Sequence, residues 1–340
     1  MARVDHLTGG IYRISTYAPE KRISFNQFLI DDDEPALIHT GTFPMYADVR
    51  SAITQVLDPS RLRHVIVPHF EADECGGMGR FVAEAPNAVL ACSALSARIN
   101  LLQWDYAGPV KGMQDGDVLD LGRHRLRAWE TPHVHHWDSL MVVEETTASL
   151  FPSDLFIQPN EQPAIVRENL GADMCGWYRA AGIFGGADPV LRVVGRVERL
   201  GPIWVNPMHG GSLPADVLPG YTAALRSLPF TFDGRIFGRQ LPDGTQCRAL
   251  RARGPSYCRT FERLRESTFG LNAPHDLPKI CCESDYVLQH RDTPRTNKGG
   301  RVFGFDLELC RPDEAGEGHE IDHGFGLSSK GFIVTPIASG

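Results

Sequence analysis

A short stretch of the sequence, HFEADECGG at residues 69–77, crowds one imidazole and three carboxylates into six residues. It follows RHVIVP, an apolar run that is typical of a buried strand. Carboxylates this close together repel one another unless a positive charge lies among them. The residues concerned, His69, Glu71, Asp73 and Glu74, are of the types that bind metal ions. We therefore predict a metal site at the end of this strand.

Three further segments place metal-binding residues directly after strand-like sequence. TPHVHHWDS carries His133, His135 and His136, FPSDLF carries Asp154, and NPMHGGS carries His209. Loops at strand ends are where a rigid scaffold brings together side chains that are distant in sequence. The four segments together predict one site built from imidazoles and carboxylates.

The hydrophobic pattern indicates the elements that must position these loops. Short β-rich runs occupy residues 11–40. Later strands are predicted in RHVIVP, NAVLACS, DVLDLG, HRLRAWE, LMVVEE, ASLFPSD and PIWVNPMHG, and helices in MYADVRSAITQVLD, GGMGRFVAEA, SALSARINLLQW, residues 174–184, residues 187–199 and ADVLPGYTAALRSL. Two β-sheets covered by helices on their outer faces fit this order better than a strictly alternating parallel sheet. No G-x-G-x-x-G motif and no P-loop supports a nucleotide-binding fold.

The composition changes near residue 240. Segments such as GRQLPDGTQCRALRARGPS, RDTPRTNKGGR and RPDEAGEGHE are polar and rich in turn-forming residues, while YCRTFERLRESTFG has the pattern of a helix. We predict a domain over residues 1–240 and a C-terminal extension over residues 241–340. The extension packs on the first domain or serves in dimerisation, and we expect a homo-oligomer.

Charge and composition exclude several classes of partner. The 340 residues carry 34 Lys and Arg against 42 Asp and Glu, a net charge of −8, and no basic run suggests nucleic-acid binding. No stretch is apolar enough for a signal core or a membrane span. The eight cysteines form no CxxC pair and are expected to be free thiols. We expect a soluble, cytoplasmic protein.

The combined motif resembles the metallo-β-lactamase superfamily, and within it the flavodiiron and oxygen-binding di-iron proteins. The shared features are His-x-Glu-x-Asp, a His after TP, an Asp in SD and a His before Gly. FNQFLIDDDEPALIHTG is also similar, with His39 where hydrolases of the superfamily usually carry the aspartate of DTG. The resemblance covers about residues 8–235 and implies an α+β fold, an αββα sandwich of metallo-β-lactamase type with a C-terminal extension.

The resemblance also implies a site with two half-sites. One metal ion would be held by His69, Glu71 and His135, the other by Asp73 and His209, with Asp154 bridging the two ions.

Two assignments in this site stay open. His135 fits the ligand position in TPHVHHWDS, with His136 as the alternative. The related proteins often have His where this chain has Glu74. Glu74 either binds the second ion or turns aside and leaves that ion an open position.

Glu71 decides the expected metal. Zinc hydrolases of the superfamily usually read His-x-His-x-Asp-His, whereas this chain has a carboxylate at the second position. Mixed carboxylate and imidazole ligands suit iron or manganese better than zinc. We expect two metal ions, iron with zinc or manganese as alternatives, in a non-haem di-iron protein that binds or reduces a small oxidant, O2 with NO or peroxide as alternatives.

Flavodiiron proteins receive electrons from FMN in a fused flavodoxin-like domain. Residues 241–340 lack the Ser/Thr-rich phosphate loop that would bind FMN. We therefore expect no bound flavin in this chain and an electron-donor protein as partner, unless the protein senses O2.

The same ligand types are also compatible with three alternatives to this function. The main competing hypothesis is a di-zinc hydrolase of an ester, lactone, thioester or phosphoester. An oxygenase of an organic substrate and a degenerate scaffold also fit the sequence. Phe70, Trp137, Trp177 and Tyr178 are candidates for walling a small apolar pocket.

Overall fold

The computed structural model describes residues 2–104, 106–237 and 239–240, and four short strands further along the chain. The chain divides into two compact units, Met1–Asp243 and Gly244–Gly340. In the second unit β16 (Val287–Arg291) pairs antiparallel with β17 (Asp306–Cys310), and β18 (Gly326–Ser328) pairs antiparallel with β19 (Gly331–Ile333). The helix expected in residues 257–270 lies outside the described residues.

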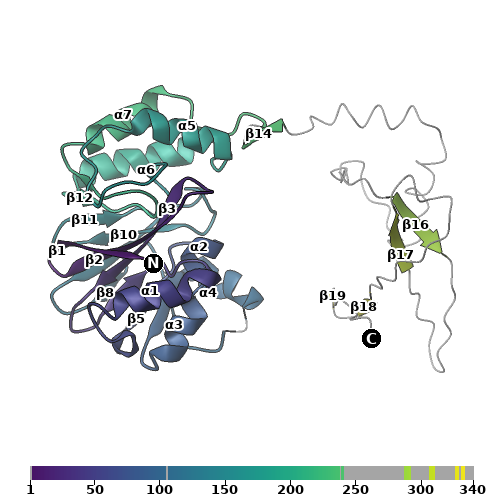
Figure 1. Ribbon diagram of the computed structural model, residues 1–340, viewed down its shortest axis with the longest axis horizontal. Coiled ribbons are helices and arrows are strands. Elements are labelled where there is room, and N and C mark those ends of the chain that lie inside the picture. Colours follow the sequence, from purple (N-terminus) through teal and green to yellow (C-terminus); the bar gives the residue numbers. More distant parts are fainter. Residues whose placement is uncertain are drawn as a thin grey trace. The chain divides into compact units, whose positions relative to one another are not determined.

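The first unit is built on two β-sheets lying between layers of helices (Figure 1). In its described part the first sheet has seven strands in chain order: β1 (Arg3–Thr8), β2 (Ile11–Ala18), β3 (Ile23–Ile30), β4 (Ala36–Ile38), β5 (His64–Ile66), β6 (Val89–Ser93) and β7 (Val110–Met113). Neighbours from β1 to β4 pair antiparallel, and those from β4 to β7 pair parallel. Parallel strands are buried on both faces, which explains the continuous apolar run at β5.

The second sheet runs in the order β13-β12-β11-β10-β9-β8 over the described residues. Its strands are β8 (Val118–Asp120), β9 (Arg125–Glu130), β10 (Leu140–Glu144), β11 (Ser149–Phe151), β12 (Trp204–Val205) and β13 (Leu213–Pro214). A further hairpin, β14 (Arg235–Ile236) with β15 (Arg239–Gln240), follows the last helix.

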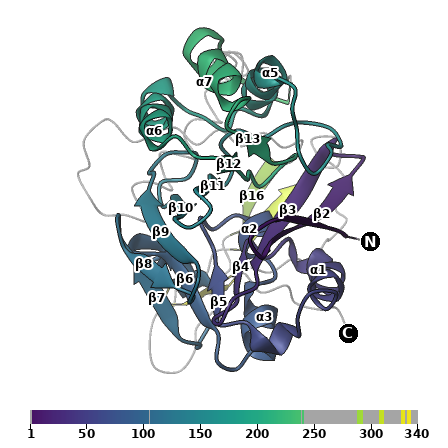
Figure 2. The same ribbon diagram turned by 90° about the vertical axis from the view of Figure 1, so that its left-hand side faces the viewer.

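Helices cover the outer face of each sheet (Figure 2). The first sheet carries α1 (Tyr46–Ile53), α2 (Ala72–Cys75), α3 (Met78–Glu84) and α4 (Ala94–Arg98), with 3-10 turns η1 (Phe43–Met45), η2 (Pro59–Arg61) and η3 (Asn100–Gln103). The second sheet carries α5 (Gly171–Ala181), α6 (Ala187–Leu200) and α7 (Leu218–Ser227). The αββα order predicted from the sequence is therefore confirmed.

Helix α6 shows how sequence sets these outer layers. Val190, Val193, Val194 and Val197 fall at helical spacing and are the buried residues of the helix. Gly201 then takes a left-handed φ of 60°, which ends the helix. The helix thus has one apolar face against the second sheet and a polar face outward.

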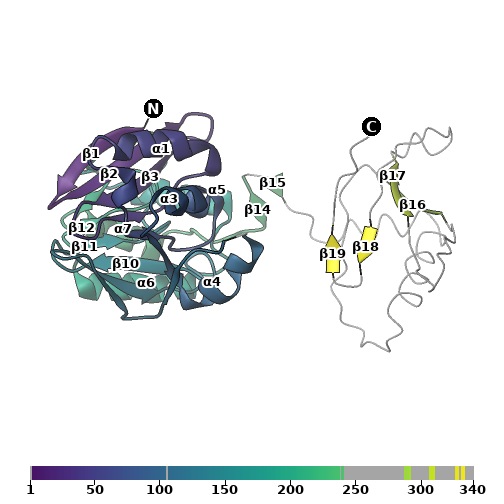
Figure 3. The ribbon, with the colours of Figure 1, turned by 90° about the horizontal axis from the view of Figure 1, so that it is seen from below.

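Three apolar clusters hold the layers together. One lies between the two sheets and includes Phe28, Ile38, Ile66 and Phe151. The others lie between each sheet and its own helices. Figure 3 shows the same layers from below. Cys75, Cys92 and Cys175 are buried free thiols. Among the described residues no helix is long and apolar enough to cross a membrane.

Two strands of the first sheet were not predicted from the sequence. β1 and β7 are edge strands whose residues are exposed or partly exposed except Met113. An edge strand buries little apolar surface, so its sequence lacks the alternation that would reveal it. Pairing with β2 and β6 forms these strands.

Candidate metal centre

The proposed ligands lie on loops that follow strands of both sheets. The loop after β5 carries His69, and the short helix α2 that it leads into carries Asp73. The loops after β9, β11 and β12 supply His135, Asp154 and His209. The main chain joins the two sheets at this point, because the Leu140 N–H donates to the Pro68 carbonyl at 2.9 Å.

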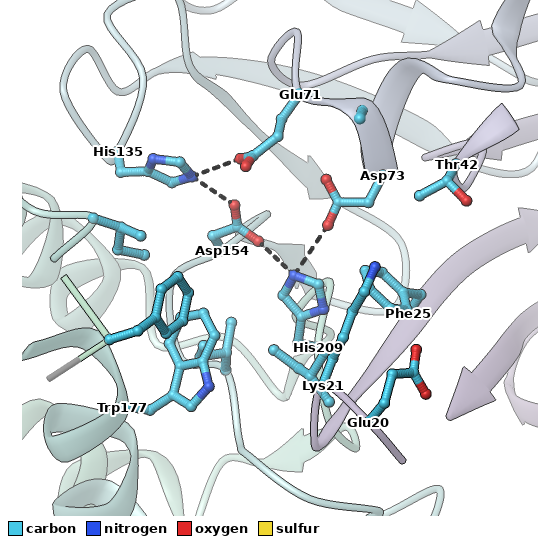
Figure 4. A pocket seen from close by; sticks show the side chains of 15 residues that line it. Glu20, Lys21, Phe25, Thr42, Glu71, Asp73, His135, Asp154, Trp177 and His209 are labelled. Carbon is cyan, nitrogen blue, oxygen red and sulfur yellow. Dashed lines mark hydrogen bonds and ion pairs between the residues drawn. The ribbon is translucent and has the colours of Figure 1, made fainter. Parts of the chain in front are cut away.

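One group of donor atoms forms around one oxygen of Asp154. Nε2 of His135 lies 2.9 Å from Oδ2 of Asp154 and 3.1 Å from Oε2 of Glu71. Nε2 of His69 lies 3.4 Å from the same Asp154 oxygen and 3.2 Å from the same Glu71 oxygen. These are the residues predicted for the first half-site, and Figure 4 shows Glu71, His135 and Asp154 among them.

A second group forms around the other oxygen of Asp154. Nε2 of His209 lies 3.2 Å from Oδ1 of Asp154 and 3.3 Å from Oδ2 of Asp73. Figure 4 shows the Asp154 carboxylate between His135 on one side and His209 on the other. The two oxygens of one carboxylate therefore face two separate donor groups, which is the arrangement that a bridging ligand requires.

The spacing of these atoms fits metal binding. Metal–ligand bonds of about 2.1 Å at angles near 90–110° separate two donors on one ion by roughly 3.0–3.4 Å. The distances are 2.9–3.4 Å in the first group and 3.2–3.3 Å in the second. Oδ1 of Asp154 is buried and makes no hydrogen bond within the described residues, although it lies 3.2 Å from His209. A buried oxygen without a hydrogen bond is suited to a cation.

The electrostatics of the centre couple its imidazoles to its carboxylates. Burial alone would lower the pKa of His135, but hydrogen bonds to Asp154 and Glu71 outweigh it and raise the pKa to about 10. Burial is likewise outweighed for His69, where Glu74 and Glu71 raise the pKa to about 9. Hydrogen bonds from His135 and His69 lower the pKa of Glu71. A metal ion must therefore displace protons from these imidazoles.

The far edges of the imidazoles are held by second contacts. Nδ1 of His69 lies 3.0 Å from Oγ of Ser153 and 3.2 Å from Oε2 of Glu74. Nδ1 of His209 lies 2.7 Å from the Ser24 carbonyl, which can only accept a hydrogen bond. With the proton on Nδ1, the lone pair of Nε2 faces the centre.

Glu74 lies at the Nδ1 edge of His69, whereas Glu71 lies at the Nε2 edge. The buried Glu74 carboxylate accepts from the His69 N–H at 2.9 Å and from the Ser153 hydroxyl. It also lies 3.3 Å from Nδ1 of His39. Among the described residues its contacts are with these three, and not with Asp73 or His209.

The three histidines of TPHVHHWDS differ in position. Nε2 of His136 is 3.9 Å from Oε2 of Glu71, farther than the 3.1 Å of His135, and its Nδ1 is 3.6 Å from Oδ1 of Asp138. The His136 ring packs 4.6 Å from the His69 ring. His133 is exposed. The distances thus favour His135 over His136 as the ligand.

The supporting roles of two residues around Asp154 were not identified from the sequence. The Tyr178 hydroxyl donates to the Asp154 carbonyl at 2.6 Å and accepts from the Ile157 N–H at 3.2 Å. Ser153 precedes Asp154 and donates to Glu74. Its place beside the aspartate in FPSD was the available signal, but nothing in the sequence showed that its hydroxyl contacts Glu74 on α2.

Arg13 is a third residue that the sequence did not reveal. Its side chain is completely buried, and it donates to the Gly210 carbonyl at 2.6 Å and to Oδ1 of Asn26 at 3.1 Å. Asn26 in turn donates to the carbonyls of Pro207 and Gly210 at 2.9 and 2.8 Å. Arg13 and Asn26 therefore hold the loop that carries His209. A lone arginine within the apolar run IYRIST was the only signal.

A cavity of about 530 Å³ opens beside the donor groups. It is lined by Glu71, Asp73, His135, Asp154 and His209, by the apolar residues Ile23, Phe25, Ile157, Trp177, Ile183 and Phe237, and by Glu20, Lys21, Thr42 and Ala72. Of the four aromatic residues proposed from the sequence only Trp177 lines it. Trp137 is 44% exposed, and the buried Tyr178 is bonded to the Asp154 backbone.

Known proteins share this architecture. The model of a family described as "ODP family beta lactamase" matches residues 23–210. A nitric oxide reductase of Moorella thermoacetica is 26% identical over 175 residues, covering 46% of this chain and 43% of that protein. The rubredoxin oxygen:oxidoreductase of Desulfovibrio gigas superposes with a TM-score of 0.60 at 20% identity, covering 67% of this chain and 62% of that one. A 1–254 fragment of a putative diflavin flavoprotein from Nostoc superposes with a TM-score of 0.56 at 18% identity, covering 66% of this chain and 96% of the fragment.

The two central sheets, the outer helices and the strand-end loops that converge on one centre define a protein of the metallo-β-lactamase fold. The family match spans more than half of the chain, and the chain belongs to the ODP family of beta lactamase domains. The chain spans less than half the length of the curated relatives it matches.

Proposed function

We propose that the chain binds two iron ions and reduces a small oxidant, O2 or NO. The observation that carries this proposal is Asp154, whose two carboxylate oxygens face separate donor groups at 2.9–3.4 Å. Glu71 supports iron, because a carboxylate in the first group adds negative charge that stabilises the ferric state. The names of relatives, a nitric oxide reductase and a rubredoxin oxygen:oxidoreductase, agree with such a substrate.

The proposed ligands are assigned to the two ions as follows. His69, Glu71 and His135 would hold one ion, Asp73 and His209 would hold the other, and Asp154 would offer one oxygen to each. Two iron ions held here would together supply two electrons to a bound oxidant.

The surrounding side chains orient the ligands and limit the access of water. Glu74 and Ser153 keep the proton of His69 on Nδ1, so that Nε2 faces the centre. Ile157 and Phe25 are buried beside the centre and shield it from bulk water on their side. We assign Glu74 this orienting role rather than a place on the second ion.

The electrons come from a separate protein in this proposal. The Desulfovibrio relative is named for rubredoxin, and the Nostoc relative for flavin. A small electron-transfer protein or a flavoprotein is therefore the class of partner to test, and we propose that this chain binds no flavin itself.

The test is metal analysis followed by an oxidant reaction. Protein grown with ample iron should contain two iron ions per chain. After anaerobic chemical reduction, mixing with O2 or NO should change the near-ultraviolet band rapidly, and the purified chain alone should not oxidise NADH. Two zinc ions with negligible iron, a silent spectrum and turnover of a lactone or phosphodiester panel would instead assign a hydrolase.

A further inference from the structure

The cavity beside the metal centre is much larger than a diatomic oxidant requires. It measures about 530 Å³. A single water occupies about 30 Å³ in the liquid, and pockets of about 300–1,000 Å³ hold ligands of drug size. The volume therefore admits an organic molecule together with a small oxidant.

Part of the cavity wall beside the ligands is apolar and partly aromatic. Phe25 and Ile157 are buried on it, and Trp177 and Ile183 are half-buried. In Figure 4 the Trp177 indole lies below Asp154 and Phe25 lies beyond His209, with the cavity between them. Aromatic and aliphatic walls bind a flat apolar body by excluding water from both surfaces.

The exposed side chain of Lys21 lies at the rim of the cavity. Nζ of Lys21 stands 5.3 Å from the centroid of the Phe25 ring, and that ring makes an edge contact with the His209 ring at 5.3 Å. Among the described residues no carboxylate lies within ion-pair distance of this ammonium. Glu20, its neighbour in the chain, also lines the cavity. The ammonium is thus placed to pair with an anion inside the cavity.

We propose that the cavity binds an organic monocarboxylate with an aromatic body. Its carboxylate pairs with Lys21, and its ring lies against Trp177 beside the metal centre. This binding site does not depend on which oxidant the protein reduces. It rests on the proposed function only because we place it beside a centre that holds metal ions. A charge-assisted pair gives selectivity for the anion, and the apolar wall supplies the affinity for the ring.

The test uses the full chain and titration calorimetry with 3-phenylpropionate, its neutral amide and FMN. We expect one phenylpropionate per chain and binding of the amide about 10-fold weaker, in line with the loss of one charge-assisted contact. Lys21→Gln should reduce the preference for the acid over the amide to less than about 2-fold, while Trp177→Ala should weaken both ligands about equally. Lys111→Gln on β7, an exposed lysine outside the cavity, is the matched control and should bind as the unsubstituted protein does.

Three results would overturn the proposal. The first is that phenylpropionate does not bind. The second is that Lys21→Gln keeps the full preference for the acid over the amide. The third is that FMN displaces phenylpropionate and binds equally well to Lys21→Gln. The last result would assign the cavity to a flavin. Metal content and the reaction with O2 are measured separately on the unsubstituted protein. If the protein contains iron but phenylpropionate does not bind, only the proposed organic ligand is rejected. If the protein contains two zinc ions, the proposed function is rejected, but the measured binding of phenylpropionate remains valid.

Discussion

Oε1 of Glu74 lies 3.3 Å from Nδ1 of His39, and both side chains are completely buried. The sequence places His39 where related hydrolases carry an aspartate, and Glu74 where related di-iron proteins often carry a histidine. His39 has a left-handed φ of 62°, a conformation that costs a non-glycine residue energy and that holds only where the surroundings enforce it. The pair ties the end of β4 to α2, which carries Asp73.

Replacement of Glu74 should weaken the first half-site. Glu74→Ala removes the acceptor of the His69 N–H and the partner of its Nδ1, and loss of such a supporting contact typically costs about 10–100-fold in metal affinity. Glu74→Gln retains an oxygen acceptor and should lose less. Competition with a chelator measures the affinity. Equal affinities for Ala, Gln and unsubstituted protein would show that Glu74 does not position His69.

Asp154→Ala should damage the centre more than Glu74→Ala. Asp154 faces both donor groups, so its removal leaves His135 and His209 without their shared partner and should lower the metal content toward zero ions per chain. Glu74→Ala should retain at least one ion, because Asp73 and His209 are untouched. Elemental analysis of the two purified variants decides the order. A greater loss of metal in Glu74→Ala would reject Asp154 as the bridge.

Arg13→Met should loosen the loop that carries His209. The substitution leaves the Gly210 carbonyl and Asp5 without the guanidinium, and breaking such a buried pair costs about 3 kcal/mol of unfolding free energy. Arg3→Met is the control, since Arg3 pairs with the same Asp5 at 3.0 Å from an exposed position and should cost less than about 1 kcal/mol. Urea denaturation measures both. The metal content of Arg13→Met should fall by about one ion, and equal costs for the two variants would contradict the role of Arg13.

How much of the site could be predicted from the sequence depends on how far apart in the chain the contacting residues lie. His69, Asp73 and Asp154 were predictable because each follows an apolar strand within a short motif. The contact of Arg13 with Gly210 joins positions 197 residues apart, and no local pattern encodes it. The same holds for Ser153 and Glu74, which are 79 residues apart in the chain. Edge strand β1 was missed because it has no buried residue.

The first unit should fold without the second. All proposed ligands precede residue 210, and the compact unit ends at Asp243. A chain ending at Asp243 should remain monodisperse, unfold cooperatively and bind as much metal as the full chain. Size-exclusion chromatography, thermal unfolding and elemental analysis provide the measurements. Aggregation or loss of metal would show that residues 244–340 complete the core or the site.

The stability of the metal-free protein should fall as the pH rises from about 7 to about 10. The pKa values of His69 and His135 are raised to about 9 and about 10 in the folded chain, against about 6.5 when unfolded. A group whose folded pKa is raised stabilises the fold fully below its unfolded pKa, and this contribution is lost as the pH passes the folded value.

Metal affinity should change in the opposite direction over the same range, because each ion must displace protons that are bound at pH 7 and absent at pH 10. Urea denaturation of chelator-treated protein at pH 7, 8.5 and 10 tests the first trend, and competition with a chelator at the same pH values tests the second. His124→Gln is a useful control, since this buried histidine pairs with Asp32 at 2.7 Å outside the centre and its loss should leave the pH dependence of metal affinity unchanged. Metal affinity that is flat with pH, with or without His124, would mean that the imidazoles of the centre are already neutral at pH 7.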